Sequence, residues 1–290
     1  MGSSTPCGLY RGMTTETFLV LGASGKTGRR VAARLRLRGL AVRSASRSSE
    51  TRFDWSDPAG WDAALTGVDA VYVVAPAAVG PVHKFVAHAR DVGVRRLVLL
   101  SGRGADTWGD SDFGRDMRDA EDAVRGSGLE WTVLRPNNFA QNFDEELWHA
   151  PVKAGKLALP AGDIPEPFVD LEDVADVAAT VLTEPGRHSG KTYELSGPRA
   201  ITFAEAAELI ARAAGRPVAY ERISPAEYAV LLQEHGLTAD DAHHVTEMFV
   251  LMERAQLAGT TNDVATVLGR QARAFEDYVL RVAASGVWSR

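Results

Sequence analysis

The feature that most constrains the fold is a glycine-rich turn between a strand and a helix near the N-terminus. The apolar residues 18–21 form a buried-type strand and run directly into the turn. The turn contains three glycines, spaced three residues apart: Gly22, Gly25 and Gly28. Beyond them, Val31 and Leu35 recur at helical spacing. The segment therefore predicts a strand, a tight turn and the start of a helix.

Each glycine of this turn has a physical role. The first lets the chain turn sharply, the second lets the backbone approach a pyrophosphate, and the third lets the helix pack closely on the strand. The helix N-terminus supplies unpaired N–H groups and a partial positive charge. Ser24 and Thr27 add hydroxyl donors, and Lys26 belongs to the same turn. The pattern favours a dinucleotide site, with an ordinary βα turn as the alternative.

A Walker A phosphate loop is the obvious rival. Such a loop needs a glycine five residues before the Gly-Lys-Thr sequence at 25–27, and that position is Val20. The dinucleotide interpretation is therefore preferred.

The end of the next strand indicates which dinucleotide is bound. Residues 41–46 read as a strand that ends at Ser46 and Arg47. An acidic residue at this position would pair with the ribose 2′-hydroxyl of NAD, whereas a guanidinium suits the 2′-phosphate of NADP. We therefore expect NADP(H) as cofactor. In the alternatives, Arg47 is a solvated loop charge or Arg43 takes the role.

Strands and helices alternate through the first half of the chain, which predicts a parallel sheet with right-handed crossovers. The predicted strands after residue 50 cover residues 51–55, 68–76, 95–102 and 131–136, and the predicted helices cover residues 58–65, 82–90 and 115–125. Asp54, beside Trp55, is placed to accept from the adenine amino group or, equally, to cap the next helix. Ala75 and Pro76 are expected beneath the nicotinamide ribose.

The alternation loosens after Asn137. Short strands are predicted over 153–160 and 191–197, and helices over 203–214, 225–234 and 242–256. The sequence thus predicts an α/β fold with a Rossmann-type doubly wound parallel sheet and a smaller, interleaved C-terminal lobe. We assign residues 16–150 to the NADP-binding domain and 151–290 mainly to a substrate-binding lobe, with some segments returning to the Rossmann domain. Ligands bind in the crevice between the two.

Composition excludes several classes of function. The net charge is −6 and there is no basic cluster of the kind that neutralises nucleic acid. Cys7 is the single cysteine, which excludes disulfides within the chain and cysteine-based zinc sites. Asp170, Glu172 and Asp173 are clustered, but Asp170 begins a helical pattern and is interpreted first as an N-cap. We expect neither nucleic acid nor metal.

No apolar run approaches the roughly 20 residues of a membrane helix, and the N-terminus lacks the apolar core of a secretion signal. We therefore expect a cytoplasmic protein without a membrane partner, with a small-molecule substrate and with residues 1–15 as a loose tail. The oligomeric state is not determined by the sequence, and a homodimer is one assembly that it allows.

Together these motifs resemble the NmrA-like, atypical branch of the short-chain dehydrogenase/reductase superfamily. Within that branch the chain is most similar to bacterial relatives of the fungal agroclavine dehydrogenase (festuclavine synthase) group. The resemblance rests on residues 22–28, 46–47, 53–55, Ser101, 127–143 and 168–175, and on the C-terminal segment from residue 261 to residue 278.

This resemblance implies an NADP-binding Rossmann domain with the nicotinamide near Ser101 and residues 136–139. Members of the branch include imine or iminium reductases, quinone reductases and redox-sensing regulators without turnover. The resemblance therefore implies the cofactor and leaves the reaction open.

Carbonyl reductases of the wider superfamily usually carry a Tyr-x-x-x-Lys pair, whose lysine lowers the pKa of the tyrosine so that it protonates the developing alkoxide. No tyrosine of this chain has a lysine four residues later. The six tyrosines are Tyr10, Tyr72, Tyr193, Tyr220, Tyr228 and Tyr278. An iminium cation fits better, because it accepts hydride without a proton and needs only orientation.

Several side chains are candidates for the catalytic site, and each has a structural alternative. Trp108 is expected to stack on the substrate or to pack between the two parts of the protein. Asn137 and Asn138 follow a strand end, where their amides bind nicotinamide or substrate or form a turn. Carboxylates that could stabilise a cation, or belong to a solvated loop, are Asp106, Asp110, Asp112 and Asp116.

The leading hypothesis is an NADPH-dependent reductase that transfers hydride to a cyclic imine, an iminium ion or an activated enone in specialised metabolism. A non-catalytic NADP(H)-sensing regulator and a quinone or carbonyl reductase are the alternatives. A closed apolar pocket beside the nicotinamide favours an enzyme, and a filled or absent pocket favours the sensor.

Overall fold

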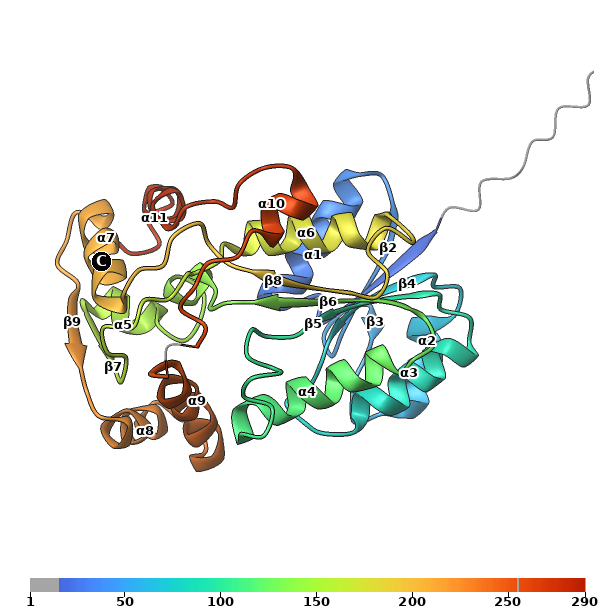
Figure 1. Ribbon diagram of the computed structural model, residues 1–290, viewed down its shortest axis with the longest axis horizontal. Helices are drawn as coiled ribbons and strands as arrows, with labels where there is room; N and C mark the ends of the chain where they lie inside the picture. Colours follow the sequence, from blue (N-terminus) through green and yellow to red (C-terminus); the bar gives the residue numbers. More distant parts are fainter. Residues whose placement is uncertain (1–15, 255, 290) are drawn as a thin grey trace, which may run out of the picture.

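The structure, a computed structural model, describes residues 16–254 and 256–289 (Figure 1). The tail predicted for residues 1–15, with Cys7, lies outside the described residues. The molecule consists of a layered α/β part and a smaller lobe beyond one end of its large sheet (Figure 1).

The large sheet has seven strands in the order β3-β2-β1-β4-β5-β6-β8, and every neighbouring pair is parallel. The strands are β1 (Thr17–Leu21), β2 (Ala41–Ser46), β3 (Thr51–Arg52), β4 (Ala70–Val74), β5 (Arg96–Leu100), β6 (Glu130–Pro136) and β8 (Lys191–Leu195). The strand order reverses between β1 and β4, the switch point at which such sheets bind ligands. The predicted Rossmann-type α/β fold is confirmed.

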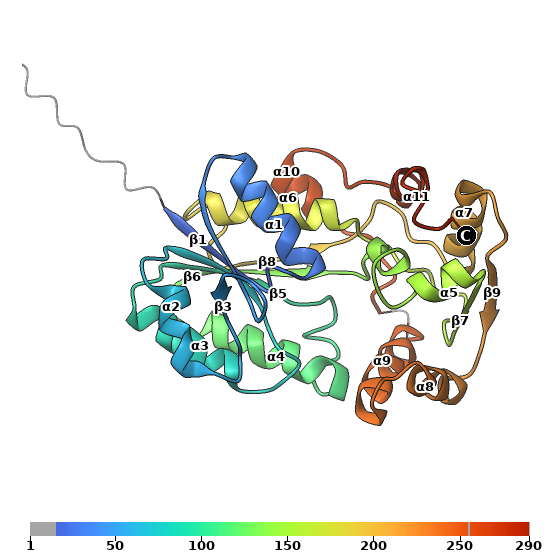
Figure 2. The same ribbon diagram turned by 180° about the vertical axis from the view of Figure 1, so that it is seen from behind.

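Helices cover both faces of this sheet (Figures 1 and 2). One face carries α1 (Lys26–Leu37), α6 (Leu171–Thr183) and α10 (Asp263–Leu268). The opposite face carries α2 (Trp61–Leu65), which follows the turn η1 (Pro58–Gly60), together with α3 (Pro81–Asp91) and α4 (Asp112–Arg125).

The alternation of side chains along β1 explains why both faces need helices. Phe18 and Val20 are buried in the core beneath α1 and α6, whereas Leu19 and Leu21 are buried in the core beneath α2, α3 and α4. Successive residues of a strand point to opposite faces, so a continuous apolar run is stable only when both faces are covered.

The lobe holds a third core, rich in aromatic side chains. Its helices are η2 (Ala140–Phe143), α5 (His149–Ala154), α7 (Phe203–Ala214), α8 (Pro225–Glu234), α9 (Ala239–Met252) and α11 (Phe275–Ala284), and its small parallel sheet pairs β7 (Lys156–Leu159) with β9 (Ala219–Arg222). Trp148 and Phe203 meet edge to face in this core, with ring centroids 5.0 Å apart. The lobe therefore packs around side chains of its own.

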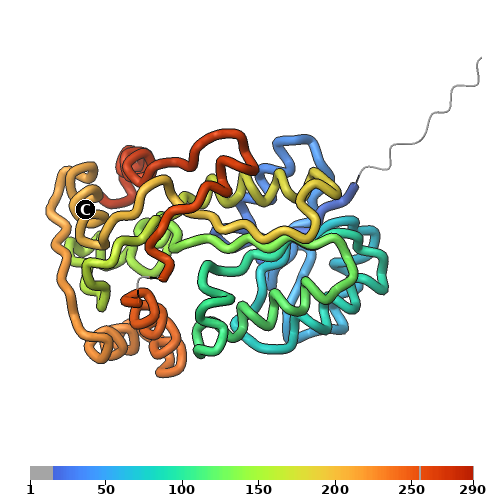
Figure 3. Tube along the Cα trace, viewed as in Figure 1, coloured from blue at the N-terminus to red at the C-terminus, as the bar shows by residue number. Residues whose placement is uncertain are grey.

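The chain passes between the two parts more than once (Figure 3). It leaves the large sheet after β6, builds α5 and β7, and returns through α6 to β8, which pairs with β6. It then enters the lobe again at α7. The segment that the sequence predicted as a strand over 191–197 is thus an edge strand of the large sheet.

Two helices predicted in the lobe are confirmed with the same bounds, α7 and α8. Each begins with a capping box, formed by Thr202 with Glu205 and by Ser224 with Glu227. The predicted N-cap role of Asp170 is also confirmed, since its side chain accepts from Glu172 N at 2.9 Å. Local capping chemistry therefore determines where these helices start.

Other predicted bounds were wrong. The strand expected over 51–55 pairs only at Thr51–Arg52. The strand expected over 153–160 begins later, because α5 ends at Gly155 in the left-handed region (φ 89°) before β7 starts. The helix expected over 242–256 runs from 239 to 252, because the Thr238 side chain caps it by accepting from Asp241 N.

Candidate functional site

The glycine turn has the geometry that its sequence predicts. Gly22 adopts φ +62°, a conformation that side chains disfavour. A Cβ atom on Gly28 would lie 2.3 Å from the Gly22 carbonyl oxygen, so helix α1 can approach β1 this closely only with glycine at position 28. The turn between β1 and α1 therefore depends on both residues.

The N-terminus of α1 is suited to bind an anion. Its N-cap is Gly25, which has no side chain to occupy the first-turn N–H groups. Ser24 is exposed beside it, whereas Thr27 is buried. Backbone N–H groups of residues 26–28, together with the Ser24 hydroxyl, thus form the surface that a pyrophosphate would meet.

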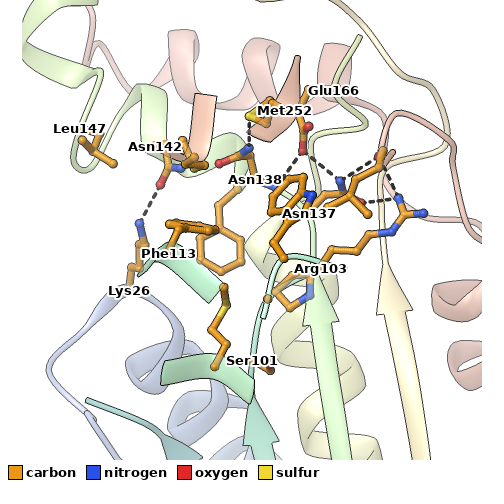
Figure 4. Close-up of a pocket in the computed structure, with 17 residues that line it drawn as sticks. Lys26, Ser101, Arg103, Phe113, Asn137, Asn138, Asn142, Leu147, Glu166 and Met252 are labelled. Carbon is orange, nitrogen blue, oxygen red and sulfur yellow. Dashed lines mark hydrogen bonds between the residues drawn. The ribbon is translucent and has the colours of Figure 1, made fainter. Parts of the chain in front are cut away.

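Lys26 links this turn to the lobe. Its Nζ donates to Asn142 Oδ1 at 2.7 Å and to Glu146 Oε2 at 2.6 Å, and it lies 5.1 Å from the centroid of the Phe139 ring. Figure 4 shows the Lys26 side chain reaching toward Asn142. The ammonium group lies between the turn and the space above the strand ends.

At the end of β2, the structure separates the two arginines that the sequence left as competitors. Arg43 Nη1 donates to the carbonyl oxygens of Ala64 at 2.7 Å and Thr66 at 2.9 Å. Arg47 is exposed next to the buried Ser46, whose hydroxyl bonds to Ser49 at 2.7 Å. Arg43 therefore has a structural role, and Arg47 is the guanidinium available at this strand end.

The residues that follow β3 and β4 were also expected at the cofactor site. Asp54 accepts from Ser56 N at 2.9 Å and from Ser56 Oγ at 2.7 Å, and these bonds hold the pKa of its carboxyl below the ordinary value. Asp54 thus holds a local turn and does not cap the next helix as its alternative expected, since the N-cap residues of η1 and α2 are Asp57 and Gly60. Trp55 packs edge to face on Phe53, with centroids 5.1 Å apart. The half-buried Ala75 and Pro76 follow β4 directly.

A cavity of about 260 Å³ opens between the large sheet and the lobe (Figure 4). Residues that follow β5 and β6 form its floor, namely Ser101–Arg103 and Pro136–Phe139, and α4 contributes Phe113 and Met117. The lobe contributes Leu147, Met248, Met252 and Leu257 to the wall. The cavity is therefore largely apolar, and the lobe forms one side of it.

One buried carboxyl group, that of Glu166, stands in this wall. Its side chain lies in a residue that is only 3% exposed. Oε1 accepts from Asn137 Nδ2 at 3.0 Å and from Asn138 N at 3.0 Å (Figure 4). Burial raises the pKa of the Glu166 carboxyl above its ordinary value, although these bonds and the charge of Arg103 act in the opposite direction.

Arg103 completes the polar end of the cavity. Its Nη1 donates to Asn137 Oδ1 at 2.9 Å, and its Nε donates to Glu194 Oε2 at 2.9 Å. The amide of Asn137 thus joins Arg103 to Glu166. Asn138 is held on its other side by Met252, since Nδ2 lies 3.6 Å from the Met252 sulfur.

Ser101 belongs to a second polar network. Its hydroxyl donates to Glu121 Oε1 at 2.7 Å, and Arg135 donates to both oxygens of Glu121, at 2.8 and 2.7 Å. Glu121 lies on α4, four residues after Met117, which lines the cavity. Helix α4 thus turns a thioether toward the cavity and a carboxylate toward Ser101.

The carboxylates proposed from the sequence lie elsewhere. Asp106 binds Arg135 at 2.6 Å, Asp110 binds Arg118 at 2.6 Å, and Asp112 pairs with Arg115. Asp116 is half-buried, and burial raises its pKa. None of these four is among the described residues that line the cavity.

Trp108 does line the cavity, and it also packs between the two parts of the protein. It is 4% exposed, and its Nε1 donates to Gln256 Oε1 at 2.9 Å. The packing role is therefore confirmed, and stacking on the substrate stays a prediction for this side chain. Asn137 and Asn138 were placed correctly in the crevice.

Sequence reasoning missed Glu166, Arg103, Phe113 and Met117. Glu166 had a detectable signal, since it is a lone acidic residue between Pro165 and Pro167 in front of the apolar Phe168-Val169. A charged residue in such a setting is either solvated or held at a site. The other three come from loops and helices whose approach to the cavity depends on the tertiary fold.

The switch point, the glycine turn and the helix N-terminus together define a dinucleotide-binding Rossmann protein. Residues 22–185 match the family model described as NAD(P)H-binding, and the chain belongs to that family. NAD(P)H is accordingly its cofactor, and the residues present fit it: an uncapped α1 N-terminus, and glycines where a Cβ would collide with backbone.

Two curated relatives cover nearly the whole chain. The (4-alkanoyl-5-oxo-2,5-dihydrofuran-3-yl)methyl phosphate reductase of Streptomyces griseus is 36% identical, over 90% of this chain and 95% of its own. Agroclavine dehydrogenase of Claviceps fusiformis is 30% identical, over 91% of this chain and 96% of its own. The predicted resemblance to the agroclavine dehydrogenase group is confirmed, and the relatives include reductases.

Solved structures share the fold. An NADPH-dependent quinone oxidoreductase from Escherichia coli superposes with a TM-score of 0.75 at 23% identity, covering 91% of this chain and 99% of its own. The negative transcriptional regulator NmrA, in complex with NADP, superposes with a TM-score of 0.71 at 14% identity, covering 93% and 96%. The NmrA-like architecture is therefore confirmed.

Two further findings concern only residues 16–254 and 256–289. No helix there is long and apolar enough to cross a bilayer. No group of three or more His, Cys, Asp or Glu side chains in this part of the chain is arranged to hold a metal ion.

Proposed function

We propose that this protein is an NADPH-dependent reductase that transfers hydride to a cyclic imine, an iminium ion or an activated enone in specialised metabolism. The observation that carries the proposal is the largely apolar cavity beyond β5 and β6, whose floor includes Ser101 and residues 136–139, the expected neighbours of the nicotinamide. A cavity of about 260 Å³ is of a size for a small cyclic molecule.

The names of the relatives agree with this class of substrate. The Streptomyces griseus relative is named for a substrate that carries an unsaturated oxo-dihydrofuran ring, which is an activated acceptor of hydride. Agroclavine dehydrogenase is named as a dehydrogenase, a class of enzyme that transfers hydride between a substrate and a cofactor.

The residues of this chain supply orientation. The α1 N-terminus and Ser24 bind the pyrophosphate, and Arg47 binds the 2′-phosphate, which gives the preference for NADPH over NADH. Asn137 and Asn138 hold the nicotinamide or the ring of the substrate, and Met248 and Met252 of α9 close the cavity against water. The bound cofactor supplies the hydride.

Two other functions share the fold. A redox sensor is suggested by NmrA, and a quinone reductase by the Escherichia coli enzyme. A largely apolar cavity beside the strand ends favours turnover over sensing, because a protein that only binds NADP(H) has no need of a space for a substrate.

The proposal is tested with purified protein by following NADPH oxidation with four acceptors: dihydroisoquinoline, N-methyl dihydroisoquinolinium, an unsaturated furanone and a benzoquinone. Turnover of an imine, iminium or furanone supports the proposal. Turnover of the quinone alone replaces it with the quinone reductase. If no acceptor is reduced and NADP⁺ binds as tightly as NADPH in tryptophan-quenching titrations, the sensor is the better assignment.

A further inference from the structure

Glu166 is a buried acid in the wall of the cavity. Burying an isolated carboxylate is costly, so a carboxyl group at 3% exposure must be neutralised or bonded. The two donors to it are amides, Asn137 Nδ2 and Asn138 N, and both bond to Oε1. Neutral amides orient a carboxyl group without supplying the full countercharge of a salt bridge.

No charged group forms a hydrogen bond to Glu166 among the described residues. Arg103, from the loop after β5, is bonded to Asn137 Oδ1 and to Glu194 of β8, so its charge is shared. From α9, the neighbour is the uncharged Met252, which contacts the Asn138 amide. Burial accordingly outweighs the neighbouring charge and raises the pKa of Glu166.

The backbone that carries Glu166 is held in place. Glu166 N donates to Ile201 O at 2.8 Å, and Ile201 N donates back to Glu166 O at 3.1 Å. Pro165 and Pro167 flank the residue and restrict its backbone further. The carboxyl group therefore has a fixed position in the cavity wall, as a group that delivers a proton must have.

We infer that Glu166 is a catalytic residue that donates a proton to the imine nitrogen of the substrate, so that the preferred substrate is a neutral cyclic imine with a basic nitrogen. The inference rests on the proposed reductase function and narrows its substrate class. It also provides a proton donor in a chain that lacks the Tyr-x-x-x-Lys pattern.

The proton is placed on Oε2, because Oε1 already accepts two N–H donors. The O–H bond of Glu166 breaks and an N–H bond forms on the imine, which leaves an iminium ion beside a carboxylate. Hydride from the cofactor then adds to the iminium carbon, and the C=N π pair becomes the nitrogen lone pair. Glu166 regains its proton from solvent when the amine product leaves.

The test compares two acceptors that differ only in the need for a proton. Dihydroisoquinoline must be protonated, whereas N-methyl dihydroisoquinolinium carries a permanent positive charge. Glu166→Gln is expected to slow turnover of the imine at least about hundredfold, the range of general acid catalysis, and to change turnover of the N-methyl iminium less than threefold, a bound of about 0.7 kcal/mol in barrier.

The pH profile is the readout that a merely structural role would not change. Wild-type turnover of the imine should fall as the pH rises through the pKa of Glu166, and turnover of the N-methyl iminium should not show this fall. Glu166→Asp, which keeps the carboxyl group, should retain the pH-dependent fall at a lower rate. The matched control is Asp163→Asn, which removes an exposed carboxylate from the same segment and should behave as wild type.

A second arm does not depend on turnover. Tetrahydroisoquinoline, a cyclic ammonium ion, is titrated by calorimetry into protein saturated with NADP⁺, with the neutral ether isochroman as its isostere. Glu166→Gln should weaken binding of the amine at least about tenfold and leave binding of isochroman unchanged. If wild type reduces neither nitrogen acceptor nor the unsaturated furanone, the proposed function fails, while this arm still decides whether Glu166 meets the substrate nitrogen.

Three results overturn the inference. Equal slowing of both acceptors by Glu166→Gln would assign the residue to the architecture of the cavity. Unchanged turnover of the imine would remove it from the reaction. An affinity for tetrahydroisoquinoline that Glu166→Gln leaves unchanged would show that the carboxyl group does not face the nitrogen.

Discussion

At the residue scale, the contact between Gly28 and Gly22 sets how closely helix α1 approaches strand β1. A methyl group on residue 28 would lie 2.3 Å from the Gly22 oxygen and 2.8 Å from its carbonyl carbon, and neither backbone atom can rotate away. Gly28→Ala is therefore expected to cost about 1–3 kcal/mol of unfolding free energy and to weaken NADPH binding, because the phosphate turn must widen. Urea denaturation and fluorescence titration measure the two effects.

Gly60→Ala is the control for this substitution. There the nearest atom to a new Cβ is a carboxylate oxygen of Asp57, 3.3 Å away at the end of a side chain that can move. NADPH affinity should match wild type. Equal losses of affinity in the two variants would mean that α1 is not positioned by the contact at residue 28.

Arg47 accounts for a preference for NADPH over NADH if its guanidinium group binds the 2′-phosphate of NADPH. A charge-assisted bond of this kind is worth about 1.5–3 kcal/mol. Arg47→Ala is therefore expected to weaken NADPH binding at least about tenfold and to leave NADH binding nearly unchanged. Tryptophan-quenching titrations with both cofactors give the ratio.

Arg43→Ala is the matched variant, because this arginine lies on the same strand and donates to backbone carbonyl groups. It should lower stability and keep the preference for NADPH. A loss of preference in Arg43→Ala rather than in Arg47→Ala would reverse the assignment of the two side chains.

The same scale shows what the sequence could and could not predict about the site. The turn geometry at Gly22 and Gly28 and the position of Asn137 in the cavity were predicted correctly, because strand ends and tight turns have local signatures. Asp116 was a candidate because it follows the strand that carries Ser101, whereas Glu166 lies in an aperiodic segment and was not considered. Its place in the cavity depends on the backbone pairing with Ile201, which no local pattern reveals.

At the scale of elements, helix starts with side-chain caps were the most predictable feature. Thr202 accepts from Glu205 N at 3.1 Å, and Glu205 accepts in return from Thr202 N at 2.8 Å. Thr202→Ala is expected to lower the unfolding free energy by about 1 kcal/mol, because α7 packs its buried Phe203 and Ile210 into the lobe core. Urea denaturation followed by circular dichroism measures the loss.

Thr266→Ala provides the comparison inside a helix. Its hydroxyl donates back to Asn262 O at 3.0 Å on the exposed side of α10, where alanine is the better helix former. This variant should be as stable as wild type or slightly more stable. A similar loss of unfolding free energy in both variants would mean that the cap at Thr202 contributes no more than an ordinary helix position.

At the scale of the whole molecule, the sequence predicted the layers better than the connections. The central strands β1, β4 and β5 follow from apolar runs between helices, since a strand buried on both faces has no polar alternation. The pairing of β8 with β6, and of β7 with β9, joins residues far apart in the chain. Such pairings depend on which strand edges remain unpaired once the rest of the chain has folded, and a local sequence pattern does not show this. The homodimer and the cytoplasmic location stay predictions.

Ion pairs connect helix α1 to the rest of the molecule and make its stability depend on pH. Arg30 binds Glu145 at 2.5 Å and Glu172 at 2.8 Å, and Arg34 binds Asp176 at 2.7 Å and also Glu172. Burial alone would raise the pKa of Glu172, but its bonds to the two arginines outweigh burial and lower it below the ordinary 4.5. The pKa values of Glu145 and Asp176 are lowered for the same reason.

A lowered carboxyl pKa in the folded state stabilises the protein above the pKa of the unfolded chain, and this contribution is lost as the pH falls through the folded value. Wild type should therefore lose unfolding free energy as the pH drops below about 4.5, the ordinary value for glutamate. Glu172→Gln should be less stable than wild type at neutral pH, by roughly 1 kcal/mol, because two guanidinium groups lose their shared carboxylate. The stability curves of the two proteins should then converge in acid.

Urea denaturation at a series of pH values measures the gap between the two curves. Glu208→Gln, a change of the same kind on the exposed face of α7, is the control and should follow the wild-type curve. A gap between wild type and Glu172→Gln that stays constant from neutral to acid pH would mean that the carboxylate acts through packing. A gap that closes would assign the acid sensitivity of the molecule to the ion pairs between α1 and α6.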